Sequence, residues 1–398
     1  MNVQQTQEIN PKDFAWRFWL ALPIYPFGNR RTIRKEVVKD TIWTFDQLQG
    51  IFYVVVPVRM TVVKLEEGGL LVYAPVAPTL ECIRLVNELV ASHGEVKYII
   101  LSTISGLEHK IFVGPFAQCF PKAEVFVAPE QWSFPLNLPL SWLGLPHKRT
   151  SVLPFDSSQT PFAKEFDYAI LGPIYLGPGK FAEVAFFHKR SHTLLVTDSV
   201  VSVSEEPPAI VQLDPYPLLF HAKDKPSDIV EDNQANRNKG WQRICLFALY
   251  FSPSVLEVPT WSEVFGDARK APERSKKAYF GLFPFKWQDD WKRSFDALRG
   301  DGRLFVAPIL QTLILNRAPQ EAIAWAEKVA SWDFHWVIPC HLDSPIKAEP
   351  DEFRQAFSFL EKQSSSSYPL PEEDFKLLRN IDAGLNKFGI VPPMKEKI

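Results

Sequence analysis

The stretch Val96-Lys97-Tyr98-Ile99-Ile100-Leu101-Ser102-Thr103-Ile104-Ser105-Gly106-Leu107-Glu108-His109 guides the interpretation of this 398-residue chain. Its first half is a short apolar run rich in β-branched residues, which predicts a buried strand over Val96–Leu101. Small polar residues follow, and then an acid and a histidine. In α/β folds, ligands bind beside the carboxyl ends of the strands. We therefore expect Glu108 and His109 to lie at a functional edge of a sheet.

Two later segments have the same form, an apolar run that ends in a potential metal ligand. The run Thr193–Thr197 is followed by Asp198, and the run Phe334–Cys340 is followed by His341. With the acid and histidine of the first stretch, they supply two imidazoles and two carboxylates. This set suits one divalent ion such as Zn, Fe or Mn, which could activate a water and polarise a substrate oxygen. Taken singly, each residue is equally typical of a hydrogen-bonding cap at a strand end.

Composition narrows the class of protein. The hydrophobic fraction of 46% and the charged fraction of 23% are ordinary for a globular protein. The formal net charge of −2 gives no general attraction to nucleic acid, so no nucleic-acid partner is expected. The four cysteines lie far apart without a C-x-x-C pair, which favours a reducing compartment. No run approaches the roughly 18 apolar residues of a membrane span, and the N-terminus does not resemble a targeting signal. A cytoplasmic location is therefore expected.

Residues 1–40 form an arm in which aromatic residues precede a basic cluster. Phe14, Trp16, Phe18 and Trp19 come first, followed by the cluster of Arg30, Arg31, Arg34 and Lys35. Aromatic residues beside basic ones are typical of an interfacial membrane anchor or of a partner-binding arm, so the protein could also lie peripheral to a membrane. The alternative is that the arm packs on its own domain and that its basic residues are solvated.

The region from residue 42 to residue 200 reads as β-rich. We expect strands over 51–56, 59–65, 70–73, 96–101, 124–128, 166–171, 183–187 and 193–197, with helices over 79–91 and 111–120. Thr79 is the expected N-cap of the first helix. The segment 130–154 reads as a loop that walls the site, and its aromatic residues Trp132, Phe134 and Trp142 favour a large, apolar small-molecule substrate.

The rest of the chain predicts an insertion followed by helices around one last strand. Residues 204–300 are irregular and proline-rich, which indicates an insertion or a lid. Further helices are expected over 241–251, 287–298, 304–315, 319–332, 350–362 and 372–388, and the last strand over 334–338. The expected organisation is an arm (1–40), a first half with Glu108, His109 and Asp198 (41–203), the insertion (204–300), and a second half with His341 (301–398).

Four segments resemble the metal-binding motifs of the metallo-β-lactamase superfamily, in the same order. Thr103–His109 resembles the motif T-H-x-H-x-D-H, with Ile104 and Gly106 at the first two histidines and Glu108 at the aspartate. Three further segments resemble the P-G-H loop, the strand that ends in the metal-bridging aspartate, and the closing P-x-H: Gly177–Lys180, Leu194–Asp198 and Pro339–His341. The usual I-D-T-G is replaced by Tyr73-Ala74-Pro75. The similarity covers about residues 50–200 and 300–345.

This resemblance implies an αββα sandwich, in which two mixed β-sheets lie face to face with helices outside. The helical and loop insertion 204–300 would then lie beside the metal edge. No P-loop, no G-x-S-x-G nucleophile elbow and no H-E-x-x-H helix is present to suggest another chemistry.

The resemblance further implies a centre with one metal ion rather than two. All three histidines of the family's first metal are replaced, by Ile104, Gly106 and Lys180. The second metal's set corresponds to Glu108, His109, Asp198 and His341, with one conservative change. Lys180 would place a cation near the emptied first position, where it could orient an anionic substrate group. The alternative is that Lys180 is a solvated loop residue.

The whole chain also resembles an uncharacterised family of cyanobacterial and plant-plastid proteins, from which no activity can be transferred. The leading hypothesis is a metal-dependent hydrolase in which one ion activates water and Asp198 helps to position it. Its substrate would be an ester, thioester, lactone or phosphoester. Two alternatives stay open. One is a non-catalytic scaffold or assembly factor that kept the fold and uses its arm to bind a membrane or a protein. The other is a mononuclear iron redox protein.

Overall fold

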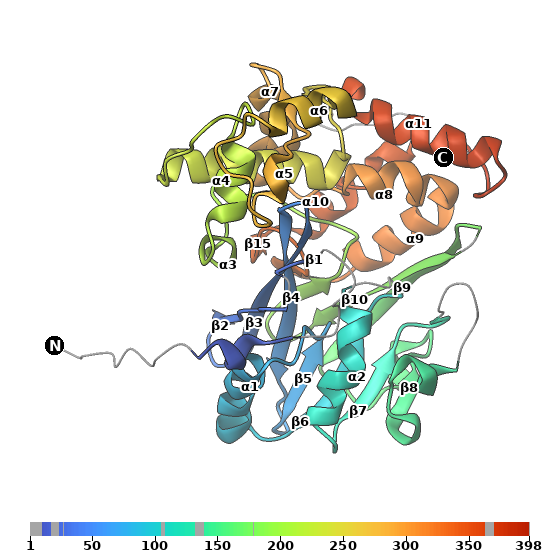
Figure 1. Cartoon of the computed structure of the whole chain (residues 1–398). Coiled ribbons are helices and arrows are strands. Elements are labelled where there is room, and N and C mark those ends of the chain that lie inside the picture. Colours follow the sequence, from blue (N-terminus) through green and yellow to red (C-terminus); the bar gives the residue numbers. More distant parts are fainter. Residues whose placement is uncertain are drawn as a thin grey trace.

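Two β-sheets packed face to face form the centre of the computed structural model, which describes residues 10–16, 24–26, 28–104, 108–131, 139–177, 179–362 and 370–397 (Figure 1). The larger sheet has the order β1-β3-β4-β5-β6-β7-β8, with β2 paired to β3, and the smaller has the order β15-β14-β11-β10-β9. Strands β5 to β8 run parallel, and so do β11 and β14, while the other pairs are antiparallel. Both sheets are therefore mixed, as predicted.

The strands and helices have the following bounds. The larger sheet contains β1 (Ile24–Tyr25), β2 (Ile33–Val38), β3 (Ile42–Ile51), β4 (Val54–Lys64), β5 (Leu70–Tyr73), β6 (Val96–Leu101), β7 (Glu124–Val127) and β8 (Thr150–Val152). The smaller contains β9 (Phe166–Tyr175), β10 (Lys180–His188), β11 (Thr193–Val196), β14 (Trp336–Pro339) and β15 (Ile346–Lys347). The helices are α1 (Leu80–His93), α2 (His109–Cys119), α3 (Ala209–Gln212), α4 (Tyr216–Ala222), α5 (Gln234–Tyr250), α6 (Trp261–Ala268), α7 (Lys292–Arg299), α8 (Pro308–Leu313), α9 (Pro319–Ala330), α10 (Pro350–Gln355) and α11 (Lys376–Lys387), and β12 (Leu256–Glu257) pairs with β13 (Lys286–Trp287).

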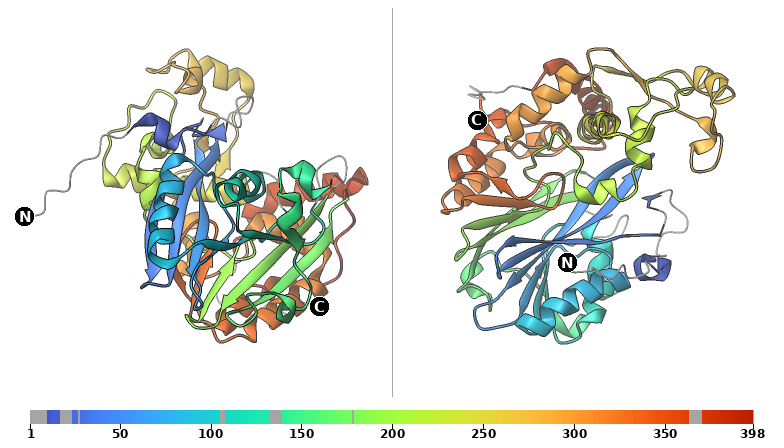
Figure 2. Two further views of the ribbon diagram at one scale, coloured as in Figure 1. Left: turned by 90° about the horizontal axis from the view of Figure 1, so that it is seen from below. Right: turned by 90° about the vertical axis from the view of Figure 1, so that its left-hand side faces the viewer.

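Strand β6 shows how the sequence builds the layers. Its side chains alternate between two apolar environments, because successive residues of a strand point to opposite faces. Ile99 and Leu101 pack in the core beneath α1 and α2, whereas Ile100 packs between the two sheets. A strand buried on both faces needs a continuous apolar run, which the sequence provides. Helices α9 and α10 cover the outer face of the smaller sheet (Figure 2). The predicted αββα sandwich is confirmed.

Helix α1 begins where its sequence predicts. The side-chain oxygen of Thr79 accepts a hydrogen bond from the backbone N–H of Cys82 at 3.2 Å, so Thr79 is the N-cap. Cys82, Val86 and Leu89 are buried, and this spacing places them on one face of the helix. That face packs on the larger sheet and orients the chain for its return along β6. The two strands and the helix expected over residues 70–101 thus form a β–α–β unit of β5, α1 and β6.

The sequence predicted separate strands over 51–56 and 59–65, but β4 runs through Pro57 as one strand. Pro57 pairs with Leu48 of β3, and β5 pairs with β4 only from Thr61 onward. The backbone N–H of Arg59, two residues along, points away from β3 and donates to the carbonyl of Cys340 at 2.8 Å. Backbone N–H groups two residues apart in a strand point to the same side, so an N–H at position 57 would also point away from β3. Pro57 therefore costs no hydrogen bond between β3 and β4.

The described part of the arm packs on its own domain, as the alternative expected, but the three arginines of its basic cluster have partners and only Lys35 is exposed. Arg30 is buried and donates to the carbonyl of Leu48 at 2.8 Å. The guanidinium groups of Arg31 and Arg34 form ion pairs with acids of α1, at 3.0 Å in each case. Phe18 and Trp19 lie outside the described residues. Membrane or partner binding by the arm stays a prediction.

Residues 204–300 pack against the tip of the β3–β4 hairpin (Figure 2). Trp241 of α5 is fully buried there, and its indole N–H donates to the carbonyl of Ser204 at 3.0 Å. Tyr53 at the hairpin tip contacts the rings of Tyr216 and Phe220 edge-to-face. A role as lid stays a prediction. Among the described residues, no helix has the length and apolar character that crossing a membrane requires.

His221 of α4 gives this contact a pH dependence that can be measured. Its imidazole Nε2 lies 3.0 Å from the carbonyl of Phe52, and burial lowers its pKa to about 4. In the unfolded chain a histidine has a pKa near 6.5. Between these values only the unfolded chain binds the proton, so the free energy of unfolding should fall as the pH decreases from about 6.5 to 4, by up to about 3 kcal/mol. His221→Gln should flatten this slope in urea titrations. The exposed His147→Gln should keep it, and an unchanged slope in both would contradict the assignment.

Candidate metal centre

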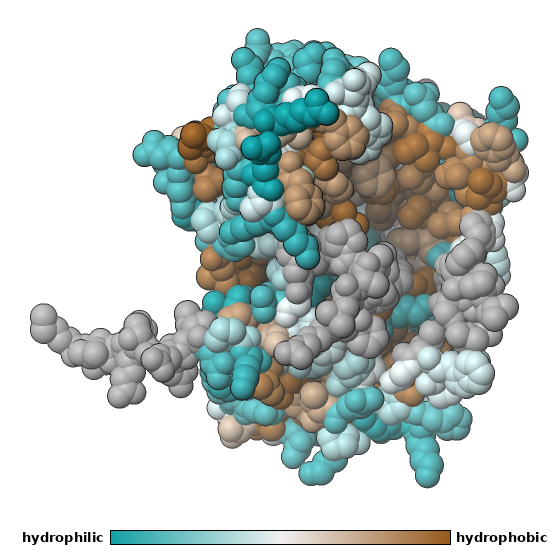
Figure 3. All heavy atoms as spheres, in the orientation of Figure 1, coloured by the Kyte–Doolittle hydropathy of each residue, from teal (hydrophilic) through white to brown (hydrophobic). Residues whose placement is uncertain are grey.

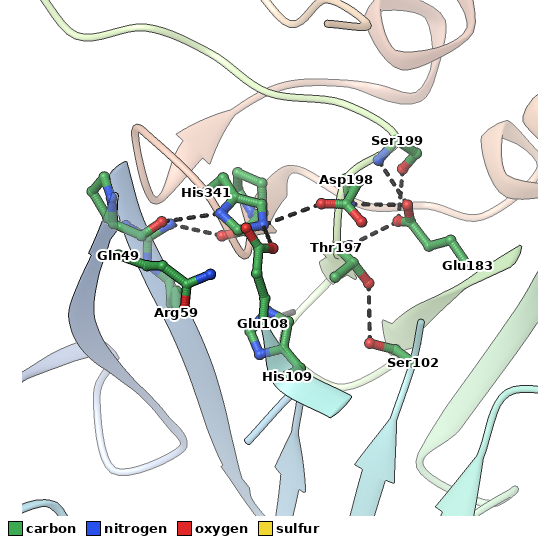
Figure 4. Close-up of polar contacts among 12 residues, drawn as sticks. Gln49, Arg59, Ser102, Glu108, His109, Glu183, Thr197, Asp198, Ser199 and His341 are labelled. Atoms are coloured by element: carbon green, nitrogen blue, oxygen red, sulfur yellow. Dashed lines mark hydrogen bonds and ion pairs between the residues drawn. The ribbon is translucent and has the colours of Figure 1, made fainter. Parts of the chain in front are cut away.

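Four side chains converge at the edge of the sandwich where its parallel strands end (Figure 4). His109 is the first residue of α2, and Glu108 directly precedes it. Asp198 follows β11 and His341 follows β14. These two strands run parallel with Val196 opposite Pro339, so both residues lie two positions beyond a paired position. This common edge is the physical reason why segments so far apart in sequence meet.

Three of the four residues form a tight group. One ligand atom each from Glu108, His109 and His341 lies within 4.8 Å of the others. The Nε2 atom of His341 lies 2.9 Å from a carboxylate oxygen of Glu108 and 3.1 Å from one of Asp198. Asp198 therefore joins the group through His341. The structure brings together all four residues that the sequence predicted as metal ligands.

Both imidazoles are held by main-chain carbonyls through their Nδ1 atoms. The Nδ1 atom of His109 lies 3.1 Å from the carbonyl of Pro75, and that of His341 lies 3.0 Å from the carbonyl of Pro57. A carbonyl only accepts, so each ring carries a proton on Nδ1, and in a neutral ring the lone pair is on Nε2. The Nε2 atom of His109 is buried and has no hydrogen-bond partner among the described residues. Metal-ligating histidines show this arrangement.

The charges of the group depend on one another. Burial by itself lowers the pKa of His341, but Glu108 and Asp198 raise it well above its ordinary value. Burial raises the pKa of Glu108, and the charge of His341 and its hydrogen bond oppose this and bring it to about 2. Burial lowers the pKa of His109, as does the charge of His341. Two carboxylates and an imidazole lone pair are all acceptors. Their close approach therefore requires a positive charge between them, either a proton on His341 or a metal ion.

The donor set fits a divalent metal ion. It offers two imidazole Nε2 atoms that are fixed by their Nδ1 hydrogen bonds, and two carboxylates of opposite charge to the ion. Zn, Fe and Mn accept this mixture of nitrogen and oxygen ligands, whereas Ca and Mg prefer oxygen alone. The buried Nε2 of His109 supplies the independent support, because a buried polar atom without a partner is costly unless a ligand satisfies it.

The family of the chain follows from comparison with known proteins. The sequence matches the model of the family described as Domain of unknown function (DUF4336) over residues 39–359, which is most of its length. The chain belongs to this family. No curated protein matches the sequence.

Solved structures with similar chains are metallo-β-lactamases and flavodiiron proteins. The flavodiiron core Flv1 from Synechocystis sp. PCC6803 is 11% identical, covers 92% of this chain over 72% of its own length, and has a TM-score of 0.43. A metallo-β-lactamase from Pontibacter korlensis is 13% identical, with coverages of 44% and 74% and a TM-score of 0.33. A mutant flavo di-iron protein from Thermotoga maritima is 9% identical, with coverages of 84% and 63% and a TM-score of 0.41. The αββα arrangement that the motifs implied is seen directly in this DUF4336 protein, as two mixed sheets that pack face to face with helices outside.

The residues that the resemblance places at the first-metal positions have other contacts in this structure. Ile104 is buried in the core between the sheets. Gly106 lies outside the described residues. The ammonium group of Lys180 forms an ion pair with Glu130 and lies 4.7 Å from the ring centre of Tyr175. Its predicted role toward an anionic substrate stays a prediction.

Of the three aromatic residues expected to wall the site, Trp142 is described. It lies in a 3-10 turn and is 73% exposed. Gly144 ends this turn and packs closely on Gly114 of α2. A β-carbon added to Gly114 would come within 2.4 Å of the Gly144 carbonyl oxygen. The loop is thus seated on the helix that begins at His109. Trp132 and Phe134 lie outside the described residues, and the substrate-binding role of all three stays a prediction.

A buried carboxylate that the sequence reasoning missed, Glu183 of β10, holds the turn that carries Asp198. Its two oxygens accept hydrogen bonds from the backbone N–H groups of Thr197, Asp198 and Ser199, at 2.7, 2.9 and 2.7 Å, and from the Ser199 hydroxyl at 2.8 Å. Burial and the charge of Asp198 raise its pKa to about 7, against these four donors. The signal was a single acid within the apolar run from Phe181 to Phe187, because such an acid must have partners.

Glu183→Gln should destabilise the protein and displace Asp198. An amide has one acceptor oxygen, so two of the four donors would lose their partner or face the NH₂ group. We expect the free energy of unfolding to fall by about 2–4 kcal/mol in urea titrations. The matched control is Glu130→Gln, an exposed acid of the same region, for which we expect about 0–1 kcal/mol. Equal effects of the two substitutions would show that Glu183 does not hold the turn.

Proposed function

We propose that this protein is a hydrolase that uses a single divalent metal ion held by Glu108, His109, Asp198 and His341. One observation carries the proposal. Two buried histidines lie in one group with the carboxylate of Glu108, and the Nδ1 atoms of both rings are bonded to main-chain carbonyls. Side chains that only capped strand ends would not need both rings fixed in the tautomer that metal binding requires.

A single ion, rather than two, is supported by the residues at the first-metal positions. Ile104 has no ligand atom and lies in the apolar core, and the charge of Lys180 is paired with Glu130. The histidines that remain are those of the second set. The proposed centre therefore has the nitrogen donors for one ion.

When bound, the ion would lower the pKa of a coordinated water and polarise a substrate oxygen. The protein's own residues would orient the groups around it. The two histidines would fix the site, since their Nδ1 contacts and burial leave them little freedom, and Glu108 would approach the ion from the start of α2. Asp198, on the turn held by Glu183, would accept a hydrogen bond from the attacking water and so direct it to the substrate.

The proposed substrate is a carboxylic ester, thioester, lactone or phosphoester with a sizeable apolar part. Figure 3 shows apolar side chains gathered in a hollow on one face of the molecule, which is the kind of surface that such a substrate would require. A phosphoester or an acid-bearing substrate would gain from a cation near the centre, and Lys180 is the residue predicted for that role.

A second candidate is supported by the contacts of His341. A protonated imidazole between Glu108 and Asp198, at 2.9 and 3.1 Å, satisfies both carboxylates without a metal. The centre would then be a buried ion triad, and the protein a non-catalytic scaffold or assembly factor. Iron redox chemistry is the further alternative, because two histidines and two carboxylates also suit iron.

Metal content distinguishes the metal-dependent hydrolase from the non-catalytic scaffold. Elemental mass spectrometry on protein purified without an affinity metal should give about one tightly held ion per chain. His109→Ala/His341→Ala should lose it, because the remaining carboxylates cannot hold a transition ion alone. The control is His147→Ala, an exposed histidine away from the centre, which should retain the ion. A folded wild-type protein that contains no ion and binds no more metal than His109→Ala/His341→Ala would favour the scaffold.

Turnover separates a hydrolase from an iron redox protein. The metal-loaded protein should hydrolyse at least one member of a panel of apolar esters, thioesters, lactones and phosphoesters. Asp198→Ala should lower kcat by 100-fold or more, the range that one positioned acid–base group contributes. The exposed Asp289→Ala is a control that should leave kcat unchanged. Oxygen consumption by the iron form, without any hydrolysis, would overturn the hydrolase and support the redox alternative.

A further inference from the structure

A second group of metal-ligating side chains lies at the opposite ends of the two strands that carry Asp198 and His341. His192 directly precedes β11, and His335 directly precedes β14. Asp333 lies two residues before His335. One ligand atom from each of the three lies within 4.8 Å of the others. Six residues of extended chain separate His192 from Asp198, which is about 20 Å. The group is therefore distinct from the candidate metal centre.

The backbone fixes the positions of these residues. The carbonyl of His192 accepts from the N–H groups of His335 and Trp336, at 2.9 and 3.3 Å. The carbonyl of His335 accepts from the N–H of Ala348 at 3.2 Å. The two histidines are thus neighbours on paired strands, and their rings stack with centres 5.3 Å apart and an interplanar angle of 17°. The pairing of β11 with β14 brings the imidazoles together without any contribution from a mobile loop.

Both rings carry their hydrogen bonds on Nδ1, as in the candidate metal centre. The Nδ1 atom of His192 lies 2.6 Å from the carbonyl oxygen of Asp333, and that of His335 lies 3.0 Å from a carboxylate oxygen of Glu349. Both partners are acceptors, so the proton is on Nδ1, and each neutral ring has its lone pair on Nε2. A carboxylate or a carbonyl behind Nδ1 is the usual support of a metal-ligating histidine.

The carboxylate of Asp333 lies between the two rings without a close hydrogen bond to either. One oxygen lies 3.4 Å from the Nδ1 atom of His192, and the other lies 4.0 Å from the Nε2 atom of His335. The second distance is too long for a hydrogen bond. Two atoms that bond one tetrahedral ion at about 2.1 Å lie about 3.4 Å apart, so a small adjustment of these side chains would admit an ion. The side chains of His192 and His335 are 45% and 46% exposed, so they can adjust to an ion that arrives from solvent.

We propose that His192, Asp333 and His335 form a second binding site, for a divalent transition ion of the zinc and copper type. Two imidazoles and one carboxylate select such ions over Ca and Mg. Glu349 is a positioning residue in this proposal, because it orients the ring of His335 while also capping α10. An ion bound here connects the start of β11 to the start of β14 and should stabilise their pairing.

Zinc(II) titration of the full-length chain tests this site. His109→Ala/His341→Ala serves as the background, which removes the candidate metal centre. In this background protein, competition with a chromophoric chelator should show that each chain binds about one zinc(II). Adding His192→Asn/His335→Asn should weaken this binding at least 10-fold, with the circular dichroism spectrum unchanged. Asparagine is suitable at position 192 because His192 has a φ of 51°, which asparagine tolerates. Adding His147→Asn instead should leave the affinity as it was.

Thermal unfolding gives a second readout. Zinc(II) should raise the Tm of the background protein, because an ion that binds only the folded chain stabilises it. It should not raise the Tm of the variant that lacks His192 and His335. Equal zinc(II) affinity and an equal rise in Tm with and without these two histidines would overturn the second site. That result would leave the proposed hydrolase centre intact, since its test uses the other pair of histidines.

Discussion

The candidate centre depends on how the guanidinium group of Arg59 ties the two sheets together. Arg59 is buried in β4 and donates to the carbonyls of Pro339 and Leu342, at 2.7 and 3.0 Å, on either side of His341. Its Nε atom pairs with Asp46 of β3 at 2.7 Å. A buried guanidinium without its acid would cost about 3–5 kcal/mol, so Arg59 and Asp46 need one another. This pair fixes the loop, and the loop places the imidazole of His341 where it meets Glu108 and Asp198.

The same construction sets a competition between a proton and a metal ion. The carboxylates approach His341 from two sides, and the Nδ1 atom of His341 is already committed to the carbonyl of Pro57. Only one charge can occupy the space at Nε2. A metal ion that bound there would have to displace the proton, so its binding would be coupled to proton release. Glu183 contributes indirectly, because without its four hydrogen bonds the carboxylate of Asp198 would not stay beside His341.

The parts of this arrangement that can be predicted from the sequence are the strands and helices, because their apolar residues recur at a regular spacing. The run Val96–Leu101 predicts a strand, and the residues after it must lie at the edge of the sheet. The same reasoning located Asp198 and His341, because parallel strands end at one edge. Contacts with residues of another strand or sheet leave no such regular spacing in the sequence. The roles of Arg59 and Glu183 depend on which carbonyl or N–H group lies opposite them, and one sequence does not specify this. The strand boundary predicted at Pro57 was wrong for the same reason, since the effect of a proline on β4 depends on which side of the strand faces β3.

Ile104, which the resemblance places at a first-metal position, serves the packing of the two sheets. The segment Ser102–Ile104 is bonded to β10 of the other sheet. Val184 donates to the carbonyl of Ser102 at 2.7 Å, and Ile104 donates to that of Ala182 at 3.2 Å. The side chain of Ile104 then completes the core between the sheets. A histidine at this position would put an imidazole into apolar surroundings, which is unfavourable unless a partner is present. Ile104 therefore stabilises the sandwich, and the ends of β11 and β14 with the start of α2 form the edge where the candidate centre lies.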